Sequence, residues 1–246
     1  MAASDHHYEH ADAMKTLQLY LAQEHPCSYL IGYSAGSIFI DLKVPVTGEL
    51  YGQLLEQGFR RSANHVYRPH CKACDACVPV RIPVQAFSAT RSQQKIIRRN
   101  SDLTVHAVAA EFNEEHYALY QRYIEQRHAD GDMYPPSIEQ FTSFLTSELD
   151  FVCFYEFRLG TELLAVAVTD VLPNGLSAMY TFFAPEDQRR SLGRYAILWQ
   201  IQESQRLGVE YLYLGYWIKD CQKMNYKTQY QPLEGFTDQA WQLVHA

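Results

Sequence analysis

The order of apolar patterns after residue 103 constrains the fold of this chain more than any other feature of its sequence. An alternating segment, LTVHAVA, precedes two stretches with helical spacing, at residues 113–129 and 137–147. Three apolar segments follow, joined by short turns rich in Gly, Pro and Asn, which are typical of hairpins. A helix at residues 192–207 and the strand YLYLGYW complete the order. This succession predicts an α+β fold.

The first hundred residues predict shorter elements. Residues 17–21, 37–41 and 78–84 alternate as strands. The segment TGELYGQLLEQG, residues 47–58, describes an amphipathic helix with a threonine cap and a glycine end. Residues 90–100 predict a basic helix. With 246 residues, the chain has room for one large domain or for two small domains with cores of their own. We expect an N-terminal Cys-containing α+β subdomain at 1–101 and a second domain at 102–246.

Three cysteines between residues 71 and 77 form a C-x2-C-x2-C pattern. The two residues between neighbouring cysteines make a turn that can point consecutive thiolates at one centre. A closed site needs a fourth donor, and the sequence offers Cys27, His65 or His70. The lack of a second C-x2-C pair argues against a zinc ribbon. Two alternatives remain, an iron–sulfur cluster or a compact turn of reduced thiols that only packs. The candidate cluster ligands are Cys27, Cys71, Cys74 and Cys77.

Basic residues concentrate in the segment that contains these cysteines. Residues 58–99 hold nine basic side chains and one acidic side chain, a net charge of +8, whereas the whole chain carries −7. The remainder therefore sums to about −15, and the asymmetry is typical of a polyanion-binding face on an acidic protein. A solvated helix face is the alternative. The residues that we expect to bind nucleic-acid phosphates are Arg91, Lys95, Arg98 and Arg99.

Several long motifs resemble one known family. They are PCSYL at 26–30, GFRRS at 58–62, VYRPHC at 66–71, CDACVPVR at 74–81, RSQQKIIRRNSDL at 91–103, RHADGDM at 127–133 and GYWIKD at 215–220. In these segments the chain resembles the bacterial aspartate/glutamate leucyltransferases, relatives of the arginyl-tRNA–protein transferases of the N-degron pathway. It departs from them at residues 31–33, where Ile-Gly-Tyr follows CSYL in place of a proline with a glycine and an arginine.

This resemblance implies a C-terminal domain similar to the GNAT acyltransferase fold, whose element order matches the pattern after residue 103. Acetyl-CoA-dependent GNAT enzymes carry Q/R-x-x-G-x-G/A where the CoA pyrophosphate meets a helix N-terminus. In this chain the equivalent residues are 188–193, with Ser191 in place of the first glycine. The substitution weakens the case for CoA without excluding it.

The resemblance further implies transfer of leucine from Leu-tRNA to the α-amine of proteins that begin with Asp or Glu. Reading the acceptor's carboxylate needs a cationic fork, which arginine supplies. We expect one of two adjacent arginines to face the ligand and the other to pack or meet tRNA, because successive side chains of an extended segment point to opposite faces. The residues that we expect around the acceptor are Arg60, Arg61, Tyr67 and Arg68.

The expected reaction requires little chemistry from side chains. An α-amine is partly neutral at pH 7 and an aminoacyl ester is already activated, so positioning should dominate and no cofactor is required. Backbone N–H groups of residues 176–183 are the expected oxyanion donors, and no side chain identifies itself as a general base. The alternatives are an RNA-binding or iron–sulfur sensor module without enzymatic activity, and a CoA-dependent N-acetyltransferase.

Three further segments have two interpretations each. Two carboxylates beside Gly131 are typical of a turn or of an amine-binding site. The aromatic residues at 211–217 favour core packing or a wall for an adenosine. Lys219, Lys223 and Lys227 either meet phosphate or lie on the surface. The sequence shows no signal-peptide pattern and no apolar run of about 18 residues, so we expect a cytoplasmic protein without a membrane partner. The six cysteines fit a reducing compartment.

Overall fold

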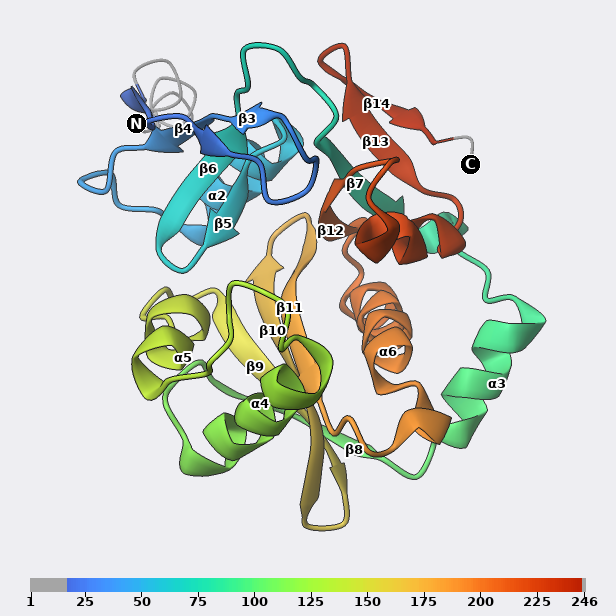
Figure 1. The fold of residues 1–246 in the computed structure, drawn as a ribbon. Coiled ribbons are helices and arrows are strands. Elements are labelled where there is room, and N and C mark those ends of the chain that lie inside the picture. Colours follow the sequence, from blue (N-terminus) through green and yellow to red (C-terminus); the bar gives the residue numbers. More distant parts are fainter. Residues whose placement is uncertain (1–16, 245–246) are drawn as a thin grey trace, which may run out of the picture.

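The computed structural model describes residues 17–244, which form a large and a small sheet with helices packed on them (Figure 1). The small sheet has the order β1-β4-β6-β5, the large sheet has the order β14-β13-β7-β12-β11-β10-β9-β8, and β2 pairs with β3 separately. The strands are β1 Leu19–Leu21, β2 His25–Pro26, β3 Ser34–Ala35, β4 Ser37–Ile40, β5 Arg60–Ser62, β6 His65–Pro69, β7 Val78–Pro83, β8 Thr104–Ala109, β9 Val152–Leu159, β10 Glu162–Leu172, β11 Gly175–Phe183, β12 Tyr211–Trp217, β13 Glu234–Thr237 and β14 Ala240–Leu243. The helices are α2 Gly48–Glu56, α3 Arg91–Arg99, α4 Glu114–Arg127, α5 Ile138–Leu145 and α6 Leu192–Leu207, with 3-10 turns η2 Val84–Ala86, η3 Gln188–Arg190 and η4 Gln222–Gln229.

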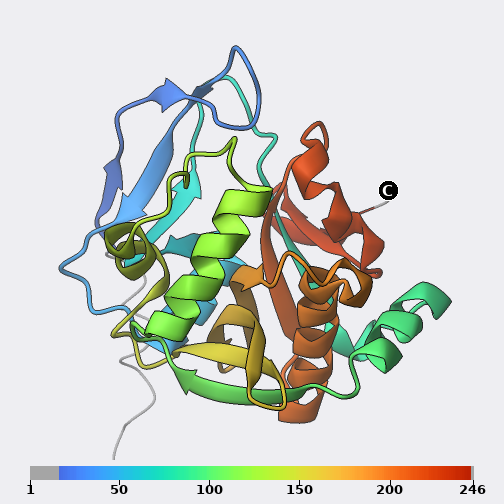
Figure 2. The same cartoon turned by 60° about the horizontal axis from the view of Figure 1, so that its bottom comes forward.

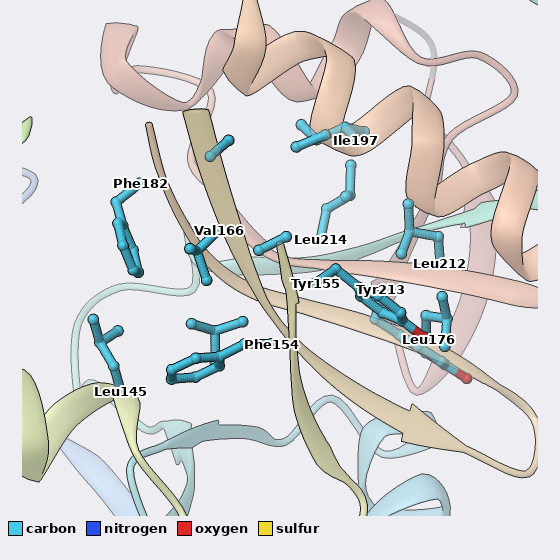
Figure 3. Close-up of a cluster of buried hydrophobic side chains, with 14 of the residues drawn as sticks. Leu145, Phe154, Tyr155, Val166, Leu176, Phe182, Ile197, Leu212, Tyr213 and Leu214 are labelled. Atoms are coloured by element: carbon cyan, nitrogen blue, oxygen red, sulfur yellow. The ribbon is translucent and has the colours of Figure 1, made fainter. Parts of the chain in front are cut away.

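Helices cover both faces of the large sheet, as Figures 1 and 2 show for α4 on one side and α6 on the other. Alternate residues of β9 demonstrate this. His116 of α4 meets Phe154, with ring centroids 5.5 Å apart, whereas Trp199 of α6 packs on Tyr155 and Phe157 at 4.7 and 5.4 Å. Because neither face meets water, the central strands β9 and β10 read as nearly continuous apolar runs. Figure 3 shows side chains of β9–β12, α5 and α6 meeting in this core.

The sequence signals that predict the helices act as expected in the structure. Thr47 Oγ1 accepts from the Leu50 N–H at 3.2 Å and begins α2, and Thr90 forms a capping box with Gln93 at the start of α3. Gly208, with φ +72°, ends α6. The strand, two helices, meander, helix and strand expected after residue 103 are confirmed as β8, α4, α5, β9–β11, α6 and β12. With β12 parallel to β11, this order agrees with the GNAT-like fold that the resemblance implies.

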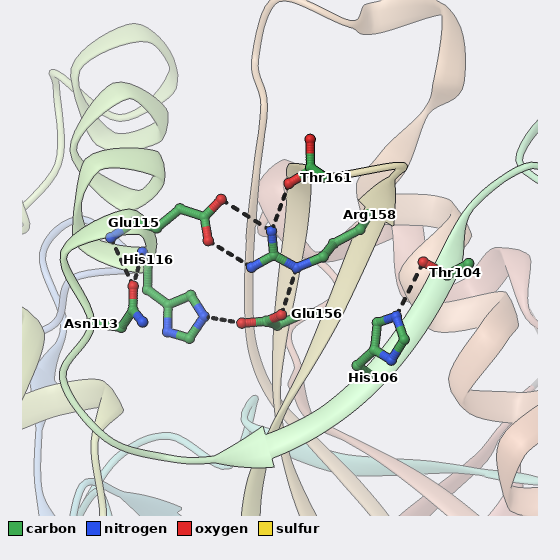
Figure 4. Close-up of polar contacts among 8 residues, drawn as sticks. All are labelled: Thr104, His106, Asn113, Glu115, His116, Glu156, Arg158 and Thr161. Atoms are coloured by element: carbon green, nitrogen blue, oxygen red, sulfur yellow. Dashed lines mark hydrogen bonds and ion pairs between the residues drawn. The ribbon is translucent and has the colours of Figure 1, made fainter.

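A polar network ties α4 to the face of the large sheet that it covers (Figure 4). His116 Nε2 lies 2.6 Å from Glu156 Oε1, and Arg158 bridges Glu156 at 2.7 Å and Glu115 at 2.6 Å. Burial alone raises the pKa of Glu156, but the hydrogen bonds from Arg158 and His116 outweigh it and hold that pKa below its ordinary value. The network therefore fixes α4 through charged groups that balance one another.

The predicted boundary between residues 101 and 102 does not follow the two sheets. β7 precedes that boundary but lies inside the large sheet, between β12 and β13. Arg81 of β7 is buried against Glu56 at 2.7 Å and Glu234 at 2.8 Å, with its guanidinium 3.5 Å from the centroid of the Tyr211 ring. The chain therefore enters the large sheet directly after the cysteine turn. Sequence patterns missed the C-terminal hairpin β13–β14 that closes this edge (Figure 1).

Candidate functional site

A pocket of about 640 Å³ opens where β11 and β12 separate. The two strands pair in parallel only from Gly175 to Ser177, opposite residues 211–213. Each strand then carries a bulge, at Met179 in β11 and at Leu214 in β12, and both residues line the pocket. Bulges re-aim backbone groups and side chains near active sites. The splay leaves one side of the β11 backbone facing the pocket, within the segment 176–183 expected to supply oxyanion donors.

The pocket draws its walls from both sheets and carries more positive than negative charge. Asp187 is its one carboxylate within the described chain, and it pairs with Arg190 at 3.0 Å. Four cations line the pocket, namely Arg60, Arg127, Arg194 and Lys227. Seven tyrosines line it as well, namely Tyr29, Tyr67, Tyr123, Tyr180, Tyr216, Tyr226 and Tyr230. This surplus of positive charge suits an anionic ligand.

Arg60 reaches the pocket because of its position on β5. Its neighbour Arg61 points the other way, where Nε and Nη2 lie 3.1 and 2.5 Å from Asp170 Oδ1 with both side chains fully buried. The Arg60 guanidinium lies directly over Gly215, where a Cβ would overlap Nη1. Gly215 has a φ of +82°, so glycine is needed there for the backbone as well as for the space. Nη1 of Arg60 is buried without a hydrogen-bond partner among residues 17–244. Such a donor implies a missing partner.

The other residues expected around the acceptor lie in different places. Tyr67 lines the pocket, and its ring is 6.1 Å from that of Tyr216, whose hydroxyl donates to Gly58 O at 3.0 Å. Arg68 is absent from the lining, since it donates to Gln57 O at 2.9 Å and covers Phe59. Arg61 is the arginine of the two that packs, because its guanidinium is buried in the ion pair with Asp170 and does not line the pocket.

Two further residues line the pocket, although the sequence did not place them at the site. Lys227 is only 6% exposed, and its Nζ donates to the Tyr216 carbonyl oxygen. Burial, and then the nearby charge of Arg60, lower the pKa of Lys227 to about 7. The two interpretations that the sequence allowed for Lys227, a phosphate contact or a surface residue, both require an exposed side chain. Tyr180 on β11 has a buried hydroxyl without a partner in the described chain, and burial raises its pKa, so it remains a donor.

The N-terminus of α6 forms one side of the pocket. Ser191 adopts a left-handed conformation, φ +53°, which is the conformation that a glycine at this position would favour. Gln188, Ser191, Leu192 and Gly193 all line the pocket. Ser191 therefore adopts the backbone conformation that the glycine of the acetyl-CoA motif would favour.

The basic helix presents its charges to solvent as expected from its pattern. Gln93 and Ile96 are its buried residues, and the four predicted tRNA-binding side chains are exposed, namely Arg91, Lys95, Arg98 and Arg99. None of the four makes a salt bridge with a carboxylate within residues 17–244. The Arg99 guanidinium donates to the Arg189 carbonyl oxygen, and Arg189 lies in η3 just before the pocket wall. The basic face of α3 is therefore connected to the turn that precedes the pocket wall.

The four candidate cluster ligands approach one another beside this pocket. Burial, and then the charges of Cys71, Cys27 and Cys74, raise the pKa of Cys77 to about 11. Backbone N–H groups of Tyr29 and Leu30 donate to Cys27 Sγ at 3.5 and 3.4 Å. No three Cys, His, Asp or Glu side chains in residues 17–244 are placed to hold a single metal ion. The four thiols influence one another's charge, and their role as cluster ligands stays a prediction.

The two carboxylates beside Gly131 do not enter the pocket. Asp130 is exposed and pairs with Lys223 at 3.3 Å, and the Gly131 N–H donates to His128 O at 3.0 Å, as in a turn. Arg127 and His128, just before them, do line the pocket. In the part of the chain that the structure describes, no helix is long and apolar enough to cross a membrane.

Comparisons with known proteins agree on one family. The models for the N terminus and the C terminus of arginine-tRNA-protein transferase match residues 25–95 and 115–237. An aspartate/glutamate leucyltransferase of Pseudomonas paraeruginosa is 60% identical over 225 residues, which cover 92% of this chain and 96% of the relative. One of Pseudomonas fluorescens is 60% identical over 229 residues, covering 93% and 97%.

A solved structure, L-PGS from Bacillus licheniformis, aligns with 68% of this chain and 50% of its own at 11% identity and a TM-score of 0.44, too distant a likeness to argue from. The family models and the leucyltransferase relatives each cover most of the fold and the pocket. The chain therefore belongs to the aspartate/glutamate leucyltransferases within the arginine-tRNA-protein transferase family.

Proposed function

We propose that this protein transfers leucine from Leu-tRNA to the α-amino group of proteins that begin with Asp or Glu, in the cytoplasm. The observation that carries the proposal is the unpaired Nη1 of Arg60 in a pocket with surplus positive charge. A carboxylate on the acceptor's first residue supplies the partner that this donor lacks. The names of the relatives point to the same acceptors.

The pocket and α3 together provide positions for the acceptor, the ester carbonyl and the tRNA. Arg60 and Tyr67 hold the acceptor's side chain, the open backbone and Tyr180 on β11 face the ester carbonyl, and the exposed face of α3 binds tRNA phosphates. Oxyanion donors of this kind contribute about 3–4 kcal/mol each to lowering the barrier in acyl transfer. Aminoacyl transfer in this site therefore depends on orientation more than on a reactive side chain.

We further propose that Cys27, Cys71, Cys74 and Cys77 hold an iron–sulfur cluster. The role of such a cluster would be structural. Tyr29 lies two residues after Cys27 and lines the pocket, so a cluster that holds Cys27 would fix the pocket wall at Tyr29. The alternative is that the four reduced thiols pack without a metal.

Transfer assays test the proposed function directly. Several radiolabelled aminoacyl-tRNAs and acetyl-CoA are each incubated with peptides that begin with Asp, Glu, Asn or Arg. We expect leucyl transfer to Asp and Glu peptides. Transfer from acetyl-CoA instead, or no transfer from any of the donors, would overturn the proposal. Arg60→Ala should remove most of the preference for Asp over Asn, about 1.5–3 kcal/mol for a charged hydrogen bond. Arg68→Ala, whose side chain lies outside the pocket lining, is the matched control.

A further inference from the structure

Lys227 is unusual among the buried cations of residues 17–244. Arg61 and Arg81 are buried as well, but each is paired with a carboxylate. Lys227 has no carboxylate partner in the described chain, and its Nζ donates to a backbone carbonyl, that of Tyr216. A lysine is seldom buried without a partner unless it can release its proton. The fold therefore keeps an ionisable amine at the pocket wall that packing alone does not require.

The groups around Lys227 come from three elements, and among them Arg60 favours its neutral form whereas Cys221 opposes it. Arg60 of β5 contributes a permanent positive charge. Tyr216 of β12 contributes its carbonyl, and the Tyr226 ring of η4 lies 5.8 Å from Nζ. The Cys221 thiol before η4 is the remaining titratable group close enough to act on the lysine. The carbonyl takes one N–H of Nζ, which leaves the rest of the amine for a ligand in the pocket.

We propose that the neutral amine of Lys227 accepts the proton that the acceptor's α-ammonium must lose before it attacks the leucyl ester. The inference rests on the proposed function, in which Arg60 holds the acceptor's side-chain carboxylate. In an N-terminal aspartate only the α- and β-carbons separate the α-nitrogen from that carboxyl group. When Arg60 holds that carboxylate, the α-nitrogen of the acceptor therefore lies near Lys227, which lines the same pocket as Arg60. The lowered pKa of Lys227, about 7, leaves a substantial fraction of the amine neutral at pH 7.

The protons and bonds of this step balance. Lys227 takes one proton from the α-ammonium and later returns it to solvent. The freed amine forms a bond to the ester carbonyl carbon, and the tetrahedral intermediate collapses with loss of the bond to the terminal ribose oxygen of the tRNA. The second proton shed by the nitrogen goes to that ribose oxygen. The products are an amide and a free tRNA hydroxyl, without oxidant or further co-reactant.

The test measures leucyl transfer in single-turnover reactions between pH 6 and 9 with the full-length chain. We expect Lys227→Met to slow transfer about tenfold at pH 7, since an α-amine with a pKa near 8 is about one-tenth neutral there, with unchanged affinity for tRNA and peptide. Lys227→Arg should be equally slow, because arginine keeps the charge but cannot release a proton. Wild-type rates should rise with pH through two ionisations, one near 7 and one near 8 from the acceptor's α-amine, and both variants should lose the first. Lys223→Met, an exposed lysine of the same turn, should match wild type.

Three results would overturn the inference. One is a Lys227→Arg enzyme with wild-type rate and pH profile, since charge alone would then suffice. Another is a Lys227→Met enzyme that loses affinity for tRNA or peptide at unchanged rate, which would make Lys227 a binding residue. The third is unchanged activity in both. If Lys227→Met does not fold, as judged by circular dichroism, the arginine variant and the wild-type profile decide. A wild-type protein without leucyl transfer would overturn the proposed function instead.

Discussion

Replacing Asp170 by asparagine should destabilise this protein strongly. The change leaves the guanidinium of Arg61 buried without a counter-charge, at a place where both side chains are fully excluded from water. Breaking a buried pair in this way costs about 3–5 kcal/mol, because the remaining charge stays desolvated. For a chain of this size each kcal/mol corresponds to about 2–4 °C in melting temperature, so we expect a fall of roughly 6–20 °C.

Thermal denaturation followed by circular dichroism measures this effect, with two variants for comparison. Glu203→Gln breaks a pair on α6 whose other member, Arg206, is exposed, and should change stability by less than about 1 kcal/mol. The double variant Arg61→Met with Asp170→Leu replaces the pair by apolar groups and should recover most of the loss. If Asp170→Asn melts as the Glu203→Gln control does, the reasoning that this pair fastens β5 to β10 is refuted.

The remaining predictions concern the basic residues of α3, the cysteines, the loss of stability at acid pH and Gly215, over which the Arg60 guanidinium lies. Neutralising Arg98 and Arg99 together should weaken tRNA binding for all sequences and flatten its salt dependence by about one unit of slope per lost contact; an unchanged slope would mean a merely solvated face. Anaerobically purified protein should be brown and contain iron, and Cys74→Ser should lose both colour and iron, whereas colourless, iron-free wild type would leave only packing. Because the folded pKa of Glu156 is lowered, its stabilisation is complete above the unfolded pKa of about 4.3 and is lost as pH falls through the folded value; melting temperatures of Glu156→Gln should therefore be lower at neutral pH and depend less on acid, and an unaltered acid dependence would contradict the assignment. Gly215→Ala should displace the guanidinium of Arg60 and reduce the preference for Asp over Asn peptides while tRNA affinity is kept, so an intact preference would separate Arg60 from acceptor recognition.

The sequence predicts most elements of this fold because their signals are local. The helix at 90–100 carries its own capping box, and the helix at 192–207 ends at Gly208, so each boundary is written within a few residues. The partner of a strand is not local information. β7 pairs with β12 and β13, more than a hundred residues away, and no periodicity of residues 78–83 could reveal this. For that reason the sequence did not reveal that residues 78–83, before the expected boundary, join the large sheet.

The same limit applies to the candidate site. Alternation along β5 predicts that Arg60 and Arg61 face opposite ways, but only tertiary structure decides which of them enters the pocket. Asp170, far along the chain, pairs with Arg61, and Arg60 is therefore the arginine that faces the pocket. The sequence named Lys227 only as a phosphate contact or a surface residue, because a lysine in a polar segment such as 222–229 is usually exposed and its burial has no local signal. No local pattern distinguishes it from Lys223.

The pocket lies at the junction of the two sheets, and this location links the choice of acceptor to the acyltransferase chemistry. β11 and β12 of the large sheet open the space in which an ester can react, but they contribute no arginine of their own to it. Arg60 arrives from the small sheet and lies on Gly215, while the Tyr216 hydroxyl donates to backbone oxygens of Gly58 and Tyr67 and so fixes β12 against β6. If the junction loosens, Arg60 moves away from the open end of β11, and the acceptor's carboxylate is no longer held beside the carbonyl that its amine must attack. Contacts between the sheets should therefore govern both rate and selectivity, whereas contacts within α3 should govern tRNA affinity alone.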